Sequence, residues 1–592
     1  MLTERENFEE VIKRGNPERF ANQYDAFAFV RNPILKYRNQ AKPGEIDKIN
    51  DWGCTVSWPV GQPGAFPNHR PDLIVMPDIT HWKETVHAPK SIYPESEWEE
   101  FIAQAEQVDR SKQFVTAMEL PGVFELTHYL GEITRILADF YEHPKEMKEL
   151  IQYITEWELN IAEGICTYIK PDVMFHHDDW GTNTSTFLAP DMFAEFFLDS
   201  YKQIYGYYHD HGVKYVVHHS DSYAETLVPY MIEMGINVWQ GVMSTNDIPK
   251  MIDQYGDKIA FMGGVDSTIV DVPDWTPEKI RAQVKKTCDA NGPLSFIPCQ
   301  TQGLNISSYP EVYGEIHKAI DEYSTEYFKT FDRKNFKDFS AEPAEREKVV
   351  VSTEAKPAEQ AEKAPAAPAD ANDEAPEEGG SIYDEISAAV QHGKRKDVKA
   401  LVQKAVDEGC NPEDVLNKGL VAAMSIIGDK FSAGEVFVPE MLISARAMSA
   451  GTKVLKPYLT KEGAEPIGKA VIGTVKGDQH DIGKNLVRMM LEGKGIEVTD
   501  LGTDVPAETF VTFLQQHDDI DIVCCSALLT TTIPEINTTI KAIEEAGLRD
   551  QVKIMIGGAP VTQAYADEVG ADAYTEDAGQ AAVRAVELLQ EK

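Results

Sequence analysis

The stretch KAVIGTVKGDQHDIGKN, residues 469–485, decides the fold of the C-terminal part of the chain. Its apolar first half predicts a buried strand, and the polar loop that follows leads into a helix. His480 stands on that loop, where the crevice at the carboxyl end of a parallel strand binds ligands. Asp478 is close enough to accept a hydrogen bond from one imidazole nitrogen, which leaves the other nitrogen free for a metal. Gly483 permits a tight turn into the helix.

The alternation of strands and helices continues after this stretch. Apolar runs predict four more strands, at 496–502, 521–527, 552–558 and 571–575. Five such strands joined by helices predict a flavodoxin-like, Rossmann-type sheet domain over residues 466–592. The preceding residues, 381–460, have apolar positions at helical spacing and no strand pattern, which predicts a four-helix domain.

Two further strands of this sheet end in residues that belong to the same edge as His480. Ser526 and Leu528 end the third strand, and Gly557 and Gly558 end the fourth. Because the carboxyl ends of parallel strands meet at one edge, we expect these residues to line a common crevice. Glycines without side chains would leave a deep slot there.

The spacing of these features resembles the cobalamin-binding domain shared by methionine synthase and the corrinoid proteins of anaerobic methyl transfer. The resemblance implies that His480 is the lower axial ligand of cobalt and that Asp478 is its proton partner. It also implies that the displaced tail of the cofactor is buried in the slot that Leu528, Gly557 and Gly558 line. Ser526 would be a polar contact to this tail or to the pair of His480 and Asp478.

The helical domain adds to this resemblance. The segments GDKF (428–431), GEVFVPE (434–440) and SARAM (444–448) resemble the helical cap of the same family, which covers the upper face of the corrin. Phe437 and Met441 are therefore predicted to contact the cofactor. For each of them, a place in the core of the helical bundle is the alternative.

A segment of different composition separates this part from the rest. Most of residues 341–380 are Ala, Glu or Pro, and none is aromatic, so the segment cannot bury enough apolar surface to offset the entropy of ordering it. We predict a disordered, flexible linker. The alternative, an irregular insertion inside one domain, is disfavoured by its length.

The composition of the whole chain limits its partners. The formal charge is −41, with 97 acidic against 56 basic residues, so a phosphate backbone would be repelled and nucleic acid is excluded as a partner. No stretch has the apolar length of a membrane span, and the first residues lack the apolar region of a signal peptide. Seven scattered cysteines make no disulfide framework, which favours a reducing cytoplasm.

Residues 1–340 alternate short apolar runs with amphipathic stretches. The runs predicted as strands are 72–80, 114–120, 172–181, 215–222, 236–242, 259–266 and 294–301. Repeated strand-then-helix units mean a parallel sheet, and a body of this length suits a single (β/α)8 TIM barrel. A doubly wound open sheet is the alternative. No GxGxxG follows the first predicted strand, which disfavours a dinucleotide site.

In a barrel the chemistry lies at the carboxyl ends of the strands, so the last residues of each run are candidates for the active site. The candidates are His176, His177, Asp178, Asp179, Trp180, His218, His219, Ser220, Asp221, Gln240, Asp266, Cys299, Gln300 and Gln302. This density of His, Asp and Cys suits a metal site or acid–base chemistry.

The same segments resemble the uroporphyrinogen-decarboxylase superfamily, whose methyltransferase branch supplies partners for corrinoid proteins. The resemblance is carried by DDWG (178–181), HSDS (219–222), GINVWQG (235–241), FMGGVD (261–266) and the late Cys299. No arginine cluster that would read substrate carboxylates follows the N-terminus, so decarboxylation is disfavoured. The resemblance implies a one-chain fusion of a methyltransferase with its corrinoid protein.

One departure from the superfamily bears on the substrate. Zinc-dependent thiol methyltransferases of this group carry His-x-Cys and a distant Cys, whereas this chain has His219-Ser220-Asp221, with Cys299 as the candidate distant ligand. His219, Asp221 and Cys299 would make a harder zinc site than two sulfurs, which favours an oxygen compound over a thiol. His219 and Asp221, then Asp179, are predicted to deliver a proton or a Lewis acid to the departing oxygen.

The predicted function is therefore corrinoid-dependent methyl transfer from a small donor, an O-methyl or methoxylated aromatic compound, to the chain's own Co(I) corrinoid. The alternatives are a methylcobamide:thiol methyltransferase, transfer from a methyl halide or another methyl donor, and a non-catalytic corrinoid carrier. The predicted partners are the small methylated substrate, a second methyltransferase that passes the methyl group to tetrahydrofolate or a thiol, and a reductive activase for Co(II).

Overall fold

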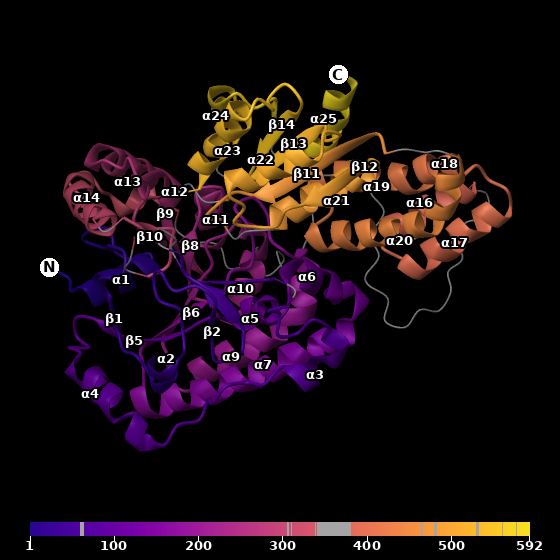
Figure 1. The fold of residues 1–592 in the computed structure, drawn as a ribbon. Coiled ribbons are helices and arrows are strands. Elements are labelled where there is room, and N and C mark those ends of the chain that lie inside the picture. Colours follow the sequence, from indigo (N-terminus) through magenta and orange to yellow (C-terminus); the bar gives the residue numbers. More distant parts are fainter. Residues whose placement is uncertain are drawn as a thin grey trace.

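The computed structural model describes residues 1–59, 64–70, 72–304, 307–309, 311–337, 339, 381–462, 466–478, 482–528, 532–558, 561–575 and 577–591. The predicted linker at 341–380 and the predicted cobalt ligand His480 lie outside these residues. The N-terminal and C-terminal parts of the chain each contain their own parallel sheet (Figure 1).

The N-terminal part is built on a seven-stranded parallel sheet in the order β1-β5-β6-β7-β8-β9-β10. Strands that follow one another around a sheet in chain order make the wall of a barrel, whereas the order of a doubly wound sheet reverses at a switch point. The strands are β1 (Phe27–Phe29), β5 (Phe114–Glu119), β6 (Val173–His177), β7 (Tyr215–His219), β8 (Val238–Val242), β9 (Ala260–Val265) and β10 (Phe296–Gln300).

Helices cover the outside of this wall, and a small antiparallel sheet lies between β1 and β5 in the chain. The helices are α1 (Glu4–Ile12), α2 (Pro33–Tyr37), α3 (Trp82–Thr85), α4 (Glu99–Gln107), α5 (Val123–Leu130), α6 (Ile133–Glu142), α7 (Pro144–Gly164), α8 (Pro190–Phe193), α9 (Asp199–Asp210), α10 (Val228–Met234), α11 (Ile248–Tyr255), α12 (Ser267–Val270), α13 (Pro277–Asn291) and α14 (Val312–Tyr327). The antiparallel strands are β2 (Lys48–Ile49), β3 (Thr55–Ser57) and β4 (Phe66–Pro67).

Six of the seven predicted strand segments form strands, and the prediction for 72–80 is wrong. Its apolar residues Met76 and Ile79 are buried, but the backbone of Met76 donates to the carbonyl of Leu130 at the end of α5 instead of joining a strand. The segment ends in the short helix η1 (Ile79–His81). The first strand is β1 instead, which lies in the apolar run AFAFV (26–30), a run that was not among the predicted strands.

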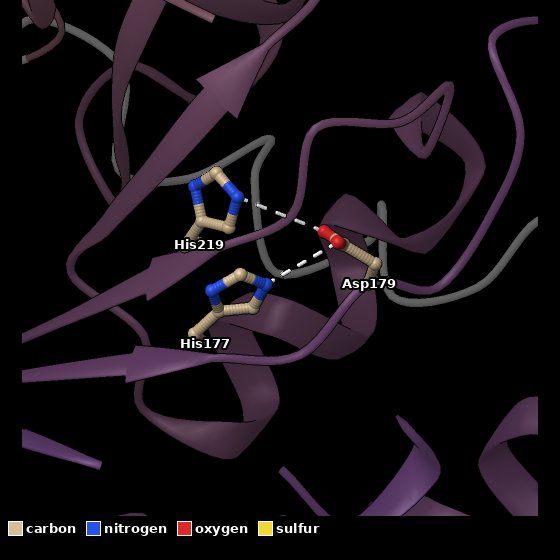
Figure 2. Close-up of side chains that lie close together, drawn as sticks. All are labelled: His177, Asp179 and His219. Carbon is tan, nitrogen blue, oxygen red and sulfur yellow. Dashed lines mark hydrogen bonds and ion pairs between the residues drawn. The ribbon is translucent and has the colours of Figure 1, made fainter. Parts of the chain in front are cut away.

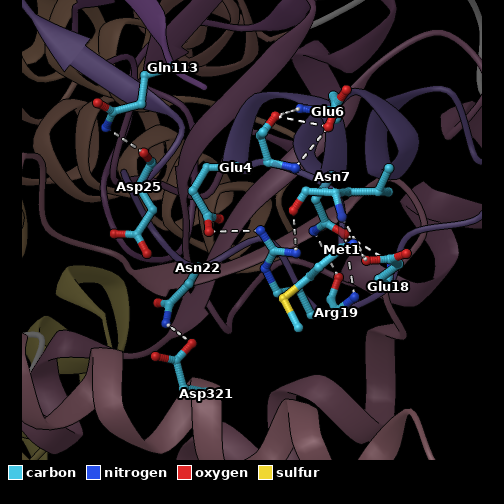
Figure 3. Close-up of polar contacts among 12 residues, drawn as sticks. Met1, Glu4, Glu6, Asn7, Glu18, Arg19, Asn22, Asp25, Gln113 and Asp321 are labelled. Atoms are coloured by element: carbon cyan, nitrogen blue, oxygen red, sulfur yellow. Dashed lines mark hydrogen bonds and ion pairs between the residues drawn. The ribbon is translucent and has the colours of Figure 1, made fainter. Parts of the chain in front are cut away.

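The segment before β1 brings the start of the sheet back towards its last strand. The backbone N–H of Gln23 donates to the carbonyl of Pro298 on β10 at 3.3 Å. The side-chain amide of Asn22 donates to Asp321 on α14 at 2.9 Å, one of several polar contacts that fix this segment (Figure 3). The parallel sheet is thereby curled into a barrel wall.

Alternate residues of the strands point to opposite faces of the wall. Phe114, Phe175, Val217, Met262 and Cys299 belong to one buried cluster inside the barrel. In β6 and β7 the next residues of the same parity are His177 and His219, so these two histidines face inwards at the carboxyl ends of their strands.

The C-terminal part begins with helices and continues as an α/β sheet. The helices are α16 (Ile382–Gln391), α17 (Arg395–Asp407), α18 (Pro412–Asp414), the π-helical turn η8 (Val415–Val421), α19 (Ala422–Ser432) and α20 (Val438–Glu462). Because α18, η8 and α19 run on without a break, they form one helix with a π-helical turn, and the predicted four-helix arrangement is confirmed.

The C-terminal sheet has the strand order β12-β11-β13-β14-β15, which is the flavodoxin-like order and confirms the predicted fold. Its strands are β11 (Gly468–Thr474), β12 (Ile496–Asp500), β13 (Ile522–Ser526), β14 (Lys553–Gly557) and β15 (Ala573–Tyr574), and its helices are α21 (Ile482–Gly493), α22 (Ala507–Gln516), α23 (Ile533–Glu545), α24 (Gln563–Val569) and α25 (Ala578–Gln590).

The helical bundle packs against helices of both the C-terminal sheet domain and the barrel. Helix α19 packs against α21 and α25, and α20 packs against α6 of the barrel. Arg446 on α20 pairs with Glu142 on α6 at 3.2 Å, and the hydroxyl of Tyr141 donates to Glu440. Within the described part of the chain, no helix has both the length and the apolar character needed to cross a membrane.

Candidate functional site

Three strands of the C-terminal sheet end side by side at the predicted ligand edge. Thr474 of β11 is the register partner of Ser526 of β13, and Ser526 is the partner of Gly557 of β14. Ser526 is half-buried there. The residues that the sequence placed on one edge are therefore neighbours in the structure.

Asp478 ties two loops of this edge together. It is fully buried, and its Oδ2 accepts hydrogen bonds from the backbone N–H of Leu528 and from the hydroxyl of Thr532, both at 2.7 Å. A buried carboxylate that holds the loops after β11 and β13 is a rigid neighbour for the residue two positions later. Its predicted role as proton partner of His480 stays a prediction.

The tight turn of this loop is made by a different glycine from the one expected. Gly477 has a φ of 81°, the left-handed region that favours glycine, and its N–H donates to Asp504 at 2.6 Å. Gly483 is instead the second residue of α21, and open space lies where a Cβ would stand.

The two glycines after β14 differ in what surrounds them. A Cβ on Gly558 would lie 1.7 Å from the carbonyl oxygen of Ala527, so the chain passes too close for any side chain, and its φ of 132° also favours glycine. A Cβ on Gly557 would meet nothing within 4 Å. The backbone is tightly packed at Gly558 and open at Gly557, and this open space is consistent with a slot for a bulky ligand.

The two predicted contact residues of the helical cap have different surroundings. Met441 is buried in α20 and belongs to the main hydrophobic core, as the alternative for this residue expected. Phe437 stands just before α20 and is half-buried, and its N–H donates to Glu440 at 3.1 Å. A contact of either residue with a cofactor stays a prediction.

The mouth of the barrel brings together His177, Asp179 and His219, whose ligand atoms all lie within 4.8 Å of one another (Figure 2). Nε2 of His177 lies 3.3 Å from one oxygen of Asp179, and Nε2 of His219 lies 3.8 Å from the other. The rings of the two histidines have centroids 4.4 Å apart. Two imidazoles and a carboxylate in this arrangement form a ligand set that zinc accepts.

Gln240 on β8 orients one of these ligands. Nδ1 of His219 lies within hydrogen-bond distance of the Gln240 side-chain oxygen, while the Gln240 amide nitrogen donates to the carbonyl of Gln300 at 3.4 Å. Because the amide nitrogen is used elsewhere, its oxygen must accept from Nδ1–H of His219. The lone pair of His219 is then on Nε2, directed towards Asp179 and His177, as a metal ligand requires.

Carboxylates outnumber the histidines around this cluster. Glu125 on α5 has an oxygen 3.6 Å from Nε2 of His177, and Asp221 donates its backbone N–H to Asp179 at 3.0 Å. Burial alone would lower the pKa of His177, but Glu125 and Asp179 raise it to about 10. Burial would raise the pKa of Asp179, but His177 and His219 hold it well below its usual range. At neutral pH His177 therefore holds a proton beside the ionised Asp179, and a metal ion would bind in place of this proton.

The predicted zinc ligands do not all come together. His219 lies in the cluster, whereas Asp221 contributes its backbone N–H, and burial and the charge of Asp179 raise the pKa of its carboxyl. Cys299 is fully buried inside the barrel, 4.0 Å from the amide nitrogen of Gln240, and burial raises the pKa of its thiol. Gln240 lies between this thiol and His219, since it contacts both.

Other strand-end candidates face the layer between sheet and helices. Nε2 of His176 lies 3.0 Å from a carboxyl oxygen of Glu158 on α7, and its Nδ1 lies 3.1 Å from the hydroxyl of Tyr205 on α9. The Tyr205 oxygen lies 2.9 Å from Nδ1 of His218, whose ring stacks on Trp180. These contacting side chains are buried behind the barrel wall, away from the mouth.

The remaining candidates have structural partners. Asp178 accepts the backbone N–H groups of Phe124 and Glu125, so it caps the N-terminus of α5, and Asp266 caps α12. Ser220 accepts from the backbone of Trp180. Gln300 and Gln302 bond to Leu304 and Ser267 at the end of β10.

Glu125 lies at the mouth of the barrel but was not among the candidate residues predicted from the sequence. It lies at the start of α5, directly after β5, whose end was predicted at 120. An acidic residue in the first turn after a barrel strand is the signal that would have identified it.

Glu119, at the end of β5, should make stability depend on pH. Both carboxylate oxygens are buried without a hydrogen-bond partner among the described residues, and burial raises the pKa of Glu119 from 4.5 to about 8. The folded state then holds a proton that the unfolded state has lost, so the free energy of unfolding should fall as the pH rises from about 4.5 to about 8, by at most about 5 kcal/mol.

Denaturant unfolding at a series of pH values should show this slope, and Glu119→Gln should flatten it and stabilise the protein at pH 8. Buried Glu125 and Glu158 have pKa values shifted in the same direction, so the difference between wild type and variant is the quantity to compare. Equal slopes for both proteins would show that Glu119 does not carry the effect.

The fold and the two sites define a cobalamin-dependent methyltransferase with a uroporphyrinogen-decarboxylase-like barrel. Residues 97–323 match the uroporphyrinogen decarboxylase (URO-D) family, and residues 382–456 and 468–587 match two families of B12 binding domain. Through its C-terminal part the chain belongs to the family of cobalamin-binding corrinoid proteins, fused here to a barrel of the URO-D family.

Relatives of the corrinoid part are standalone proteins. The dimethylamine corrinoid protein 1 of Methanosarcina acetivorans is 44% identical over 209 residues, which cover 35% of this chain and 97% of the relative. A corrinoid protein of Desulfitobacterium hafniense is 42% identical over 212 residues, covering 35% of this chain and 98% of the relative.

Two solved structures are also similar. The methanol:cobalamin methyltransferase complex of Methanosarcina barkeri has 29% identity and a TM-score of 0.33, covering 36% of this chain and 80% of that chain. A methyltransferase from Methanosarcina mazei has 13% identity and a TM-score of 0.39, covering 55% of this chain and 99% of that chain.

Proposed function

We propose that the barrel transfers a methyl group from an oxygen atom of a small methoxylated compound to the corrinoid of the same chain. The observation that carries this proposal is the ligand set at the mouth. His177, Asp179 and His219 offer two nitrogens and an oxygen, and Cys299 is not among them. Such a set binds zinc without the sulfurs that favour thiolates, and suits an oxygen ligand in the open position.

The residues present fit a zinc ion. Gln240 fixes the tautomer of His219, Asp179 faces both histidines, and Glu125 has an oxygen 3.6 Å from Nε2 of His177. A zinc ion held there would act as a Lewis acid on the ether oxygen of the donor. We propose Asp221 as the group that donates a proton to this oxygen, because burial and the charge of Asp179 both raise the pKa of its carboxyl.

The cofactor-binding roles follow the same reasoning. We propose that His480, Asp478 and Gly483 surround the cobalt side of the corrinoid, and that Ser526, Leu528, Gly557 and Gly558 line the slot for its tail. The bound corrinoid supplies a nucleophilic cobalt that accepts the methyl group. Phe437 and Met441 would belong to the cap over the other face.

The proposed division of labour assigns 1–340 to the methyltransferase, 341–380 to a linker, 381–460 to the cap and 466–592 to the corrinoid domain. A second methyltransferase that passes the methyl group to tetrahydrofolate or a thiol, and a reductive activase, would complete the cycle. The contact between α20 and α6 supports docking of the cap on the barrel.

Methylated amines are the second candidate donors. This candidate is supported by relatives of the corrinoid part, several of which are named dimethylamine or monomethylamine corrinoid proteins. These relatives match the carrier and not the barrel, so they bear on the cofactor domain more than on the choice of donor.

A donor panel tests the proposal. Reduced holoenzyme is mixed with methoxylated aromatic compounds, methylamines, methyl halides or methylthiols, and formation of the methylated corrinoid is followed by absorbance. We expect methylation with methoxylated aromatic compounds. Methylation by an amine alone would establish the second candidate, and methylation by none of the donors would leave the barrel as a docking module.

A further inference from the structure

The outer face of α6 is buried, although α6 lies on the outside of the barrel wall. Phe140 of α6 packs on Phe196 and Phe197 of the barrel, with ring centroids 4.8 Å and 5.7 Å apart, so this side of α6 faces inwards. Ala138 precedes Phe140 by two residues, which is about 200° around an α-helix, and therefore lies on the opposite face. A helix that covers a wall ordinarily exposes this face to solvent, yet Ala138 is fully buried.

A helix of the helical domain covers this face. Helix α20 packs against α6, and the two helices lie side by side in Figure 1. A guanidinium nitrogen of Arg446 on α20 lies 3.2 Å from a carboxylate oxygen of Glu142 on α6. The hydroxyl of Tyr141 on α6 donates to Glu440 on α20. Because Glu142 follows Ala138 by four residues, both side chains share the outer face of α6.

The face of α20 that meets α6 is also buried. The hydroxyl of Ser444 donates to the carbonyl of Gln391 on α16 at 3.1 Å, so this side of α20 faces the helical bundle. Leu442 precedes Ser444 by two residues and lies on the opposite face, in line with Arg446 one turn later. Leu442 is fully buried. Separating the two helices would therefore expose Leu442 and Ala138 to water, which costs free energy.

The last turn of α6 requires a cation from outside that turn. It contains Asp139 and Glu142 and no basic residue, and carboxylates at the C-terminal end of a helix oppose its dipole. Arg135, one turn earlier, lies 3.6 Å from Asp139. Burial raises the pKa of the Asp139 carboxyl to about 6, and the charges of Arg135 and Arg446 oppose this rise. Docking of α20 thus supplies the second positive charge that this end of α6 needs.

Helix α6 lies between the mouth of the barrel and the predicted corrinoid site. It follows α5, whose Glu125 has an oxygen 3.6 Å from Nε2 of His177 at the mouth. It also contacts α21, the helix that follows the predicted cobalt-binding loop. A corrinoid module docked on α6 is therefore held beside the mouth.

We infer that the outer face of α6 is a docking surface for α20 of the same chain, and that it selects this chain's own corrinoid module for methylation. Ala138, Tyr141 and Glu142 form the surface on the barrel, and Leu442 and Arg446 form its counterpart on the module. The selecting role rests on the proposed function, whereas the docking surface does not. Because the module is tethered, its effective concentration is in about the millimolar range, so a modest contact is enough.

Exchanging the charges in the full chain tests the surface. Glu142→Arg or Arg446→Glu places like charges opposite each other, which should speed amide hydrogen exchange in α6 and α20 at least about tenfold. The double variant Glu142→Arg/Arg446→Glu restores an attractive pair and should return exchange to within about threefold of wild type. Arg281→Glu, which breaks an exposed ion pair on α13, is the matched control and should leave exchange in α6 and α20 unchanged.

The rate at which a methoxylated donor methylates the corrinoid of the holoenzyme is the second readout. Each single variant should slow this step about tenfold, and the double variant should recover it. Both readouts should be independent of protein concentration, because α6 and α20 belong to one chain.

The outcomes separate the docking surface from the proposed function. Unchanged exchange in the single variants, or a double variant no better than either of them, would overturn the surface. Readouts that depend on protein concentration would place α20 of a second copy on α6 and would overturn it as well. Unchanged methylation in variants whose exchange has risen would overturn the selecting role. If exchange responds as expected but no donor methylates the corrinoid, the proposed function fails and the docking surface stands.

Discussion

His219→Ala should lower the rate of methyl transfer from donor to corrinoid by about 10³-fold or more, with the cobalamin content of the protein unchanged. The imidazole is held by Gln240 with its lone pair directed at Asp179 and His177, so removing it leaves two ligands where zinc needs three. Loss of an acid catalyst or Lewis acid at the departing oxygen accounts for a factor of this size. Rapid-mixing absorbance gives the rate, and metal analysis gives the zinc content.

Wild type should contain about one zinc per chain, and His219→Ala should contain little. Asp179→Asn, which keeps the shape of the side chain, should have the same effect on both readouts, so the result does not depend on how His219→Ala folds. His211→Ala, an exposed histidine at the end of α9, is the matched control. Full activity in both site variants would show that the chemistry occurs elsewhere.

Gly558→Ala should destabilise the C-terminal sheet by about 3 kcal/mol, whereas Gly557→Ala should change the free energy of unfolding by less than about 0.5 kcal/mol. The added methyl at 558 would lie 1.7 Å from a backbone oxygen, so β13 and β14 must separate, while at 557 it enters open space. Denaturant unfolding of the cobalamin-free chain measures both differences.

The same two variants separate stability from cofactor binding. If the cofactor tail occupies the space beside Gly557, then Gly557→Ala should weaken cobalamin binding about tenfold in spite of its unchanged stability. A Gly557→Ala protein with wild-type cobalamin affinity would place the slot elsewhere on the edge. A Gly558→Ala protein as stable as wild type would contradict the close approach to Ala527.

The sequence predicted the C-terminal sheet almost completely. Its strands are apolar runs separated by helices of ordinary length, and parallel connection then fixes which ends share an edge. Thr474, Ser526 and Gly557 accordingly end in register, as the motif spacing required. The sequence prediction assigned the turn to Gly483, whereas the structure shows a positive φ at Gly477. Both glycines stand near the loop, and only the backbone conformation distinguishes them.

In the barrel the sequence predicted where the strands end, but not which residues at those ends face the mouth. Strand alternation sends His177 and His219 into the mouth and His176 and His218 into the layer behind it, where His176 contacts Glu158 and His218 contacts Tyr205. A dense run of His and Asp gives no sign of which parity faces inwards.

The sequence by itself determined the fold class, the two-part architecture and the family, because apolar periodicity and motif spacing are local. Only the tertiary structure decided that Asp179 joins His177 and His219, and that Cys299 lies outside this cluster beside Gln240. These facts depend on side chains from separate strands and loops meeting in space. Such meetings are fixed by the curl of the sheet and the packing of helices around it, which no local pattern records.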